Sequence, residues 1–80
     1  MVQDTLGWIY YKMGEMQMAL TFLEEALSGA PETPIFNFHA GMVLQKIGRI
    51  DESKAKLSKA LESKEPFMGR EEAEALLKTL

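Results

Sequence analysis

Few side chains in this chain of 80 residues could do covalent or acid–base chemistry. There is no cysteine, so disulfides and thiolate metal sites are excluded. His39 is the only histidine, and no second histidine or acidic residue stands at metal-ligand spacing from it. We therefore expect His39 to be a surface or hydrogen-bonded residue. The run of Glu71, Glu72 and Glu74 is typical of a solvated helix start.

Motifs that would indicate an enzyme are absent. The chain has no HExxH, GxSxG, phosphate-binding loop or dinucleotide fingerprint, and His39 has no serine or carboxylate partner in a motif. The net charge of −3 argues against nucleic acid, which is bound by clustered lysine and arginine, so an RNA-binding repeat is the weakest alternative. No stretch approaches the ~18 apolar residues of a membrane span. We expect no enzyme, no cofactor, no metal and no nucleic acid partner.

An internal repeat organises the chain. A shift of 34 residues aligns the stretch 7–31 with the stretch that begins at residue 41. The identical pairs are Gly7 and Gly41, Lys12 and Lys46, Gly14 and Gly48, Leu23 and Leu57, Ala26 and Ala60, and Leu27 and Leu61. A fixed period in this range indicates a repeat architecture.

Apolar residues at helical spacing predict five helices, over residues 2–13, 16–28, 34–47, from 50 onward, and 68–80. Gly14 and Gly48 should end the first and third helices, and Thr33 should cap the third, which opens with a proline. The short connections predict antiparallel hairpins. A glycine inside a helix costs about 1 kcal/mol. Gly7 and Gly41 therefore indicate that the two helices of each hairpin approach closely.

This pattern resembles the tetratricopeptide repeat. The matching residues are Leu6-Gly7, Tyr10, Gly14, Ala19, Leu23, Ala26-Leu27 and Pro31 in the first copy, and Ala40-Gly41, Leu44, Gly48, Leu57 and Ala60-Leu61 in the second. The resemblance implies an all-α superhelix, or solenoid, in one domain. Repeat 1 covers about 1–33, repeat 2 about 34–65, and a capping helix about 68–80. The chain looks like the C-terminal two repeats and capping helix of a bacterial member, or like a very short member.

Several positions depart from the family pattern. Gln3 and Asn37 stand where the family has an early aromatic residue. In the second copy, Ser53 replaces the small Ala19 of the first, Lys54 replaces an apolar residue and Glu65 replaces a proline. These changes weaken the packing signature of the second copy in the sequence, but not its register.

The resemblance implies a protein-binding module whose first helices line a concave groove. By helical phase, eight residues should face it: Asp4, Trp8, Tyr11, Lys12, Phe38, Met42, Gln45 and Lys46. Family members that grip a terminal carboxylate place paired lysine, asparagine and arginine there, but this chain has Asp4 and Trp8. An apolar or amphipathic segment is thus the expected ligand. In the alternative interpretation, Trp8 and Tyr11 fill the space between the first helices.

A second candidate surface is the N-terminal edge. With no preceding repeat, Val2, Ile9 and parts of Trp8 or Tyr10 would be exposed, and large apolar patches usually mark an interface. This edge predicts either a homodimer, the structural alternative to ligand binding, or a face that a longer parent protein covers. The sequence leaves the compartment open: the cytoplasm is favoured, and a parent protein could be exported.

Overall fold

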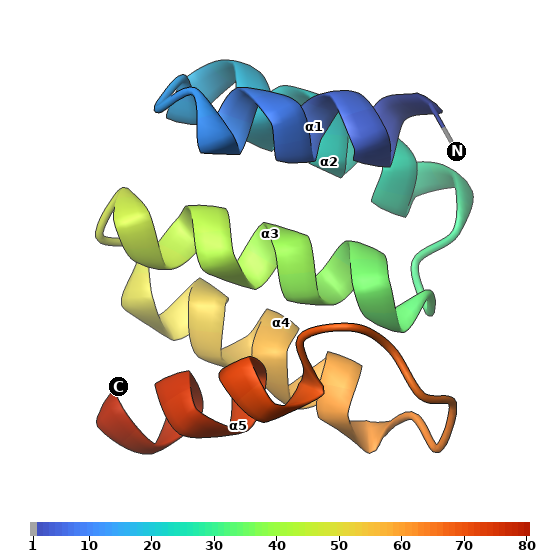
Figure 1. The fold of residues 1–80 in the computed structure, drawn as a ribbon, viewed down its shortest axis with the longest axis vertical. Helices are drawn as coiled ribbons and strands as arrows, with labels where there is room; N and C mark the ends of the chain where they lie inside the picture. Colours follow the sequence, from blue (N-terminus) through green and yellow to red (C-terminus); the bar gives the residue numbers. More distant parts are fainter. Residues whose placement is uncertain (1) are drawn as a thin grey trace.

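Five α-helices make up the described part of the chain, which in this computed structural model is residues 2–80 without the side chain of Val2. They are α1 (Val2–Lys12), α2 (Met16–Gly29), α3 (Pro34–Lys46), α4 (Ile50–Glu62) and α5 (Arg70–Thr79), and no strand occurs among these residues. The hairpins α1–α2 and α3–α4 stack, and α5 packs against α4 (Figure 1). This arrangement confirms the predicted all-α helical repeat.

The two hairpins close with the same backbone geometry. Gly14 and Gly48 adopt left-handed φ angles of 84° and 85°, where glycine carries no steric cost. The N–H of Glu15 donates to the carbonyl of Tyr10, and the N–H of Arg49 donates to that of Leu44, each at 2.9 Å. Because these turns begin one residue earlier than predicted, α1 and α3 end before Met13 and Ile47.

The other helix ends differ in part from the sequence prediction. Pro34 occupies the first turn of α3 as predicted, but the capping side chain of Thr33 makes no hydrogen bond there. The fifth helix begins at Arg70 rather than residue 68, because Gly69 takes a left-handed φ of 104° and turns the chain into the helix.

Close contact inside each hairpin confirms the inference from its glycine. A Cβ atom built on Gly7 would lie 2.7 Å from Cγ of Leu23, and one built on Gly41 would lie 2.6 Å from Cδ2 of Leu57. Both leucines are fully buried, so neither can move aside. Glycine at these positions therefore sets the distance between α1 and α2 and between α3 and α4.

Polar residues that depart from the family pattern form hydrogen bonds in the interior. Ser53, one of the departures in the second copy, is fully buried and donates to the carbonyl of Gly41 at 2.7 Å. The Asn37 amide donates to the carbonyls of Pro31 and Thr33 at 3.0 and 3.1 Å and so holds the α2–α3 connection. The hydroxyl of Ser53 therefore has a buried acceptor and joins α4 to α3.

The core consists of two apolar clusters, one on each side of α3. The first lies among α1, α2 and α3. The second joins α3, α4 and α5 around Phe38, Leu57, Ala60 and Ala73. Since Ala73 is fully buried, α5 completes the second cluster as the predicted cap should.

Candidate functional site

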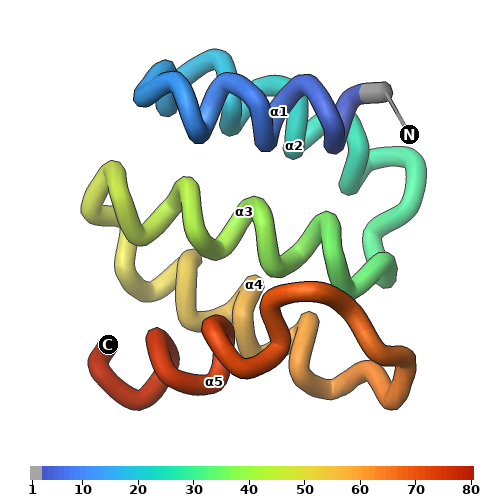
Figure 2. The backbone as a smooth tube through the Cα atoms, viewed as in Figure 1, coloured from blue at the N-terminus to red at the C-terminus, as the bar shows by residue number. Residues whose placement is uncertain are grey.

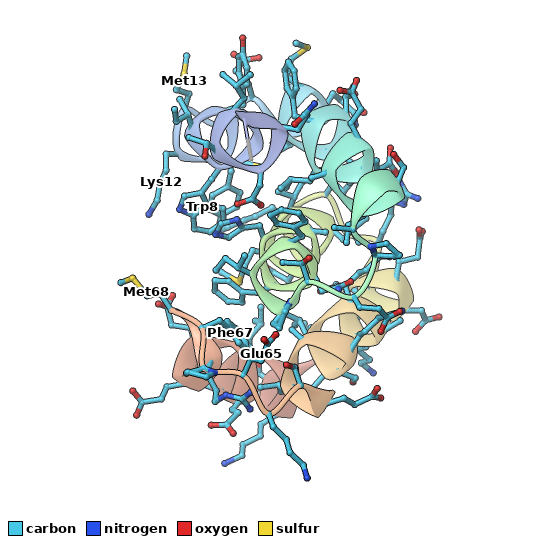
Figure 3. The ribbon with its side chains drawn as sticks, turned by 90° about the vertical axis from the view of Figure 1, so that its right-hand side faces the viewer. Trp8, Lys12, Met13, Glu65, Phe67 and Met68 are labelled. Carbon is cyan, nitrogen blue, oxygen red and sulfur yellow. The ribbon has the colours of Figure 1, made fainter. Side chains whose placement is uncertain are left out.

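One face of the molecule is hollowed between α1, α3 and α5. The helices run in the same direction there, and α3 lies between the other two (Figure 1). A hollow of about 400 Å³, called the groove below, is lined by Trp8, Lys12, Ile35, Phe38, His39, Met68, Gly69 and Glu72. Figure 3 shows Trp8 and Lys12 on one side of this opening and Met68 on the other.

Trp8 lies at the centre of an aromatic stack in the groove. Its ring centroid is 4.5 Å from that of Tyr11 and 3.9 Å from that of His39, with both pairs nearly parallel. The Lys12 ammonium lies 5.3 Å from the centroid of the indole, within the range of a cation–π contact. Trp8 and Tyr11 are half-buried, so each ring packs internally and still offers surface to a ligand.

A buried pair fixes this stack to α3. Oδ1 of Asp4 lies 2.8 Å from Nδ1 of His39, and both residues are buried. The sequence shows no carboxylate partner for His39 in a motif, but the fold supplies one. The partner comes from the preceding repeat, 35 residues away, where no local motif would reveal it. His39 is the hydrogen-bonded residue that we expected as one option, and the carboxylate of Asp4 is already engaged.

The structure gathers some of the eight predicted residues and separates others. Trp8, Lys12 and Phe38 line the groove, with Tyr11 stacked beside Trp8. Phe38 is buried in the floor, and Met42 is half-buried against the same cluster. Gln45 is half-buried and Lys46 is exposed, and neither lines the hollow. Whether these residues bind a partner stays a prediction.

The sequence prediction missed the wall that α5 and the residues just before it contribute. The groove is also lined by Met68, Gly69 and Glu72, whereas the prediction included residues of the first and third helices only. The signal that could have found this wall is the repeat itself. A second shift by 34 residues aligns Phe38 with Glu72 and so indicates Glu72 as a groove residue. Gly69 permits the close approach, because a Cβ atom there would overlap the ring of Phe38.

Glu72 acts across the groove on Tyr11. Burial raises the pKa of the Tyr11 phenol above its ordinary value, and the negative charge of Glu72 raises this pKa further. The neutral phenol is therefore favoured in the folded state. Its contribution to stability is present below pH ~10 and is lost as the pH rises through the folded-state pKa.

This geometry gives a titration test. In a Tyr10→Phe background Tyr11 is the one tyrosine, and Glu72→Gln should lower its pKa, followed by phenolate absorbance. Glu74→Gln is the control, because Glu74 does not contribute to the Tyr11 shift. An unchanged pKa in the Glu72 variant would mean that α5 does not lie across from Tyr11.

Comparison with family models shows to which family the chain is related. A family model described as tetratricopeptide repeat matches residues 3–33 and 36–67, which together exceed half of the chain. The chain belongs to the tetratricopeptide repeat family. Searches of curated proteins and of solved structures gave no match.

Tetratricopeptide repeats are non-catalytic modules for protein–protein interaction. The first matched repeat contains α1 and α2, and the second contains α3 and α4, so the groove lies on the first-helix side of both. No group of three acidic, histidine or cysteine side chains in the described part could hold a metal. None of the five helices is long and apolar enough to cross a membrane.

Proposed function

We propose that this tetratricopeptide module binds a peptide or protein segment of a partner in the groove between α1, α3 and α5. The observation that carries the proposal is Trp8, which is held in a stack yet remains half-exposed above the buried Phe38. Tryptophan and tyrosine are enriched among residues that dominate binding energy. A volume of about 400 Å³ is within the range of ligand pockets.

The lining favours an apolar or amphipathic ligand. Trp8, Ile35 and Met68 offer apolar surface, and the charges are one lysine and one glutamate, Lys12 and Glu72. Lys12 is the single cation in the groove and lies against the indole, while Asp4 is committed to His39. A site with one partly engaged cation lacks the paired donors that would grip a terminal carboxylate.

The proposal is tested by selecting peptides that bind the protein and then mapping where they bind. Twelve-residue peptides selected from a random displayed library on the immobilised protein should shift the Trp8 indole N–H in an NMR titration. Lys12→Glu should change the affinity of these peptides, whereas Lys64→Glu on the exposed α4–α5 connection should not. Shifts confined to α4, with Trp8 unmoved, would contradict the groove assignment.

The N-terminal face supports homotypic assembly as a second candidate. It is defined here by Ile9, Met13 and Met18, large apolar residues that are exposed by 49%, 65% and 43%. Val43, which occupies the position of Ile9 in the second repeat, is fully buried. The side chain of Val2 lies outside the described residues. Trp8 turns toward the groove, and Tyr10 stacks on Phe22 with centroids 5.6 Å apart.

Ile9→Glu tests this second candidate. If the protein self-associates through the N-terminal face, the buried charge should raise the dimer dissociation constant at least tenfold in sedimentation experiments. Peptide binding in the groove should stay unchanged. A wild-type protein that sediments as a monomer up to millimolar concentration would remove the homotypic candidate.

A further inference from the structure

A second hollow adjoins the groove at the connection between α4 and α5. Its volume is about 440 Å³, and it is lined by Thr33, Pro34, Ile35, Glu65, Pro66, Phe67 and Met68. We call it the loop pocket. It shares Ile35 and Met68 with the groove, so the two hollows are neighbours along one trough. The connection arches back toward the start of α3 (Figure 2).

The wall of the loop pocket is anchored from behind. The Arg70 guanidinium donates to the carbonyl of Ser63 at 2.5 Å and lies 5.1 Å from the ring of Phe67. The Phe67 ring packs on Phe38, with centroids 5.8 Å apart. These contacts hold the connection in place from both ends, so a ligand would meet a preformed pocket rather than ordering a loose loop.

Met68 stands between the two hollows with 88% of its surface exposed. It is the most exposed of the large hydrophobic residues in the described chain. Methionine is unbranched and flexible, and it adapts to apolar groups of different shapes. A side chain that lines both hollows and packs on little else is suited to cover a ligand that crosses from one to the other.

The groove and the loop pocket together are called the trough, and its lining contains more acidic than basic side chains. Glu65 lines the loop pocket and Glu72 lines the groove. Neither carboxylate takes part in an ion pair among the described side chains, where the pairs are His39–Asp4, Arg49–Glu52 and Lys59–Glu32. The one cation of the trough, Lys12, lies against Trp8. A lysine or arginine on the ligand would thus meet an unpaired carboxylate.

We propose that the trough binds an extended peptide segment that places one large apolar side chain in the groove and a second in the loop pocket, with a basic residue beside Glu72. The proposal rests on the proposed function and adds the class of ligand. In an extended segment, residues i and i+2 point to the same side about 6.6 Å apart, which suits two adjoining hollows.

Blocked pentapeptides test the spacing and the charge. The first carries leucine at positions one and three, lysine at position five and serine elsewhere. The second replaces the first leucine with serine, and the third replaces the lysine with glutamate. The two-leucine, lysine-bearing peptide should bind at least about tenfold more tightly than the one-leucine peptide, because burying one more leucine side chain favours binding by about that factor or more. It should bind about two- to fivefold more tightly than the glutamate peptide.

Variants of the protein, each with a matched control, test which residues contact the leucine and lysine side chains. Met68→Ser should remove most of the advantage of the two-leucine peptide over the one-leucine peptide. The same change at Met13, an exposed methionine on the N-terminal face, should leave this advantage intact. Glu72→Gln should abolish the preference for lysine over glutamate, and Glu74→Gln on the same helix should not. Equal affinities for the one- and two-leucine peptides, or a lysine preference that survives Glu72→Gln, would overturn the proposal.

Ligand binding in the groove and the use of the loop pocket are contradicted by different results. If the peptides shift Trp8 equally and leave Phe67, which lines the loop pocket and not the groove, unmoved, the groove binds ligands and the loop pocket takes no part. If neither these peptides nor those selected from the random library shift Trp8, the groove itself is not the binding site.

Discussion

Replacing Phe38 with alanine is expected to lower the free energy of unfolding by about 3–5 kcal/mol. The ring is buried in the second core cluster and contacts Trp8, His39 and Phe67 at once. Its loss would leave a cavity where α5 meets α3, and the groove would lose its floor. A loss of this size approaches the whole stability of many small domains.

Urea denaturation followed by circular dichroism measures this effect. Phe22→Ala is the matched control, because Phe22 is half-buried and stacks only on Tyr10 at the first hairpin. We expect the control to lose clearly less stability than Phe38→Ala. Equal losses in the two variants would mean that Phe38 has no special part in joining α3 to α5.

Gly41→Leu is expected to cost about 3 kcal/mol and to separate α3 from α4. Even a Cβ atom at this position would lie 2.6 Å from Cδ2 of Leu57, and Leu57 is fully buried on α4. The gain in helix propensity from replacing a glycine, about 1 kcal/mol, does not offset a clash of this kind.

Gly29→Leu provides the control for the same chemical change. Gly29 ends α2, and nothing lies within 4 Å of a Cβ atom built there. This variant should keep or slightly increase the thermal midpoint, whereas the Gly41 variant should lower it by 10 °C or more, on the order expected for a domain of this size. A stable Gly41→Leu protein would show that close helix approach does not determine this fold.

The fold could be predicted because its determinants are local or repeated. The glycines at the turns, the leucines opposite Gly7 and Gly41, and the small alanines recur at one period, and the period alone indicates stacked hairpins. The helix ends were harder to place. Gly69 looks like any loop glycine in the sequence, and only its left-handed backbone and its contact with Phe38 explain why α5 begins at Arg70.

The candidate site could be predicted only in part, because helical phase gives the direction of a side chain and not what it meets. Phase predicted that Asp4 faces the groove, but it could not show that His39 from the next repeat would engage its carboxylate. Helical phase also gives no information about the residues of a connection, because a connection has no helical period. The loop pocket and the place of Met68 depend on how the connection over residues 63–69 lies against the start of α3.

The most direct test of groove binding uses the methyl groups of methionine. With methionine labelled with ¹³C at the methyl carbon, Met68 reports on the groove and Met42 on the Phe38 cluster that forms its floor. Met13 and Met18 report on the N-terminal face. A peptide selected from the random library should shift the Met42 and Met68 signals and leave those of Met13 and Met18 in place. Shifts of Met13 and Met18 with an unmoved Met68 would contradict groove binding.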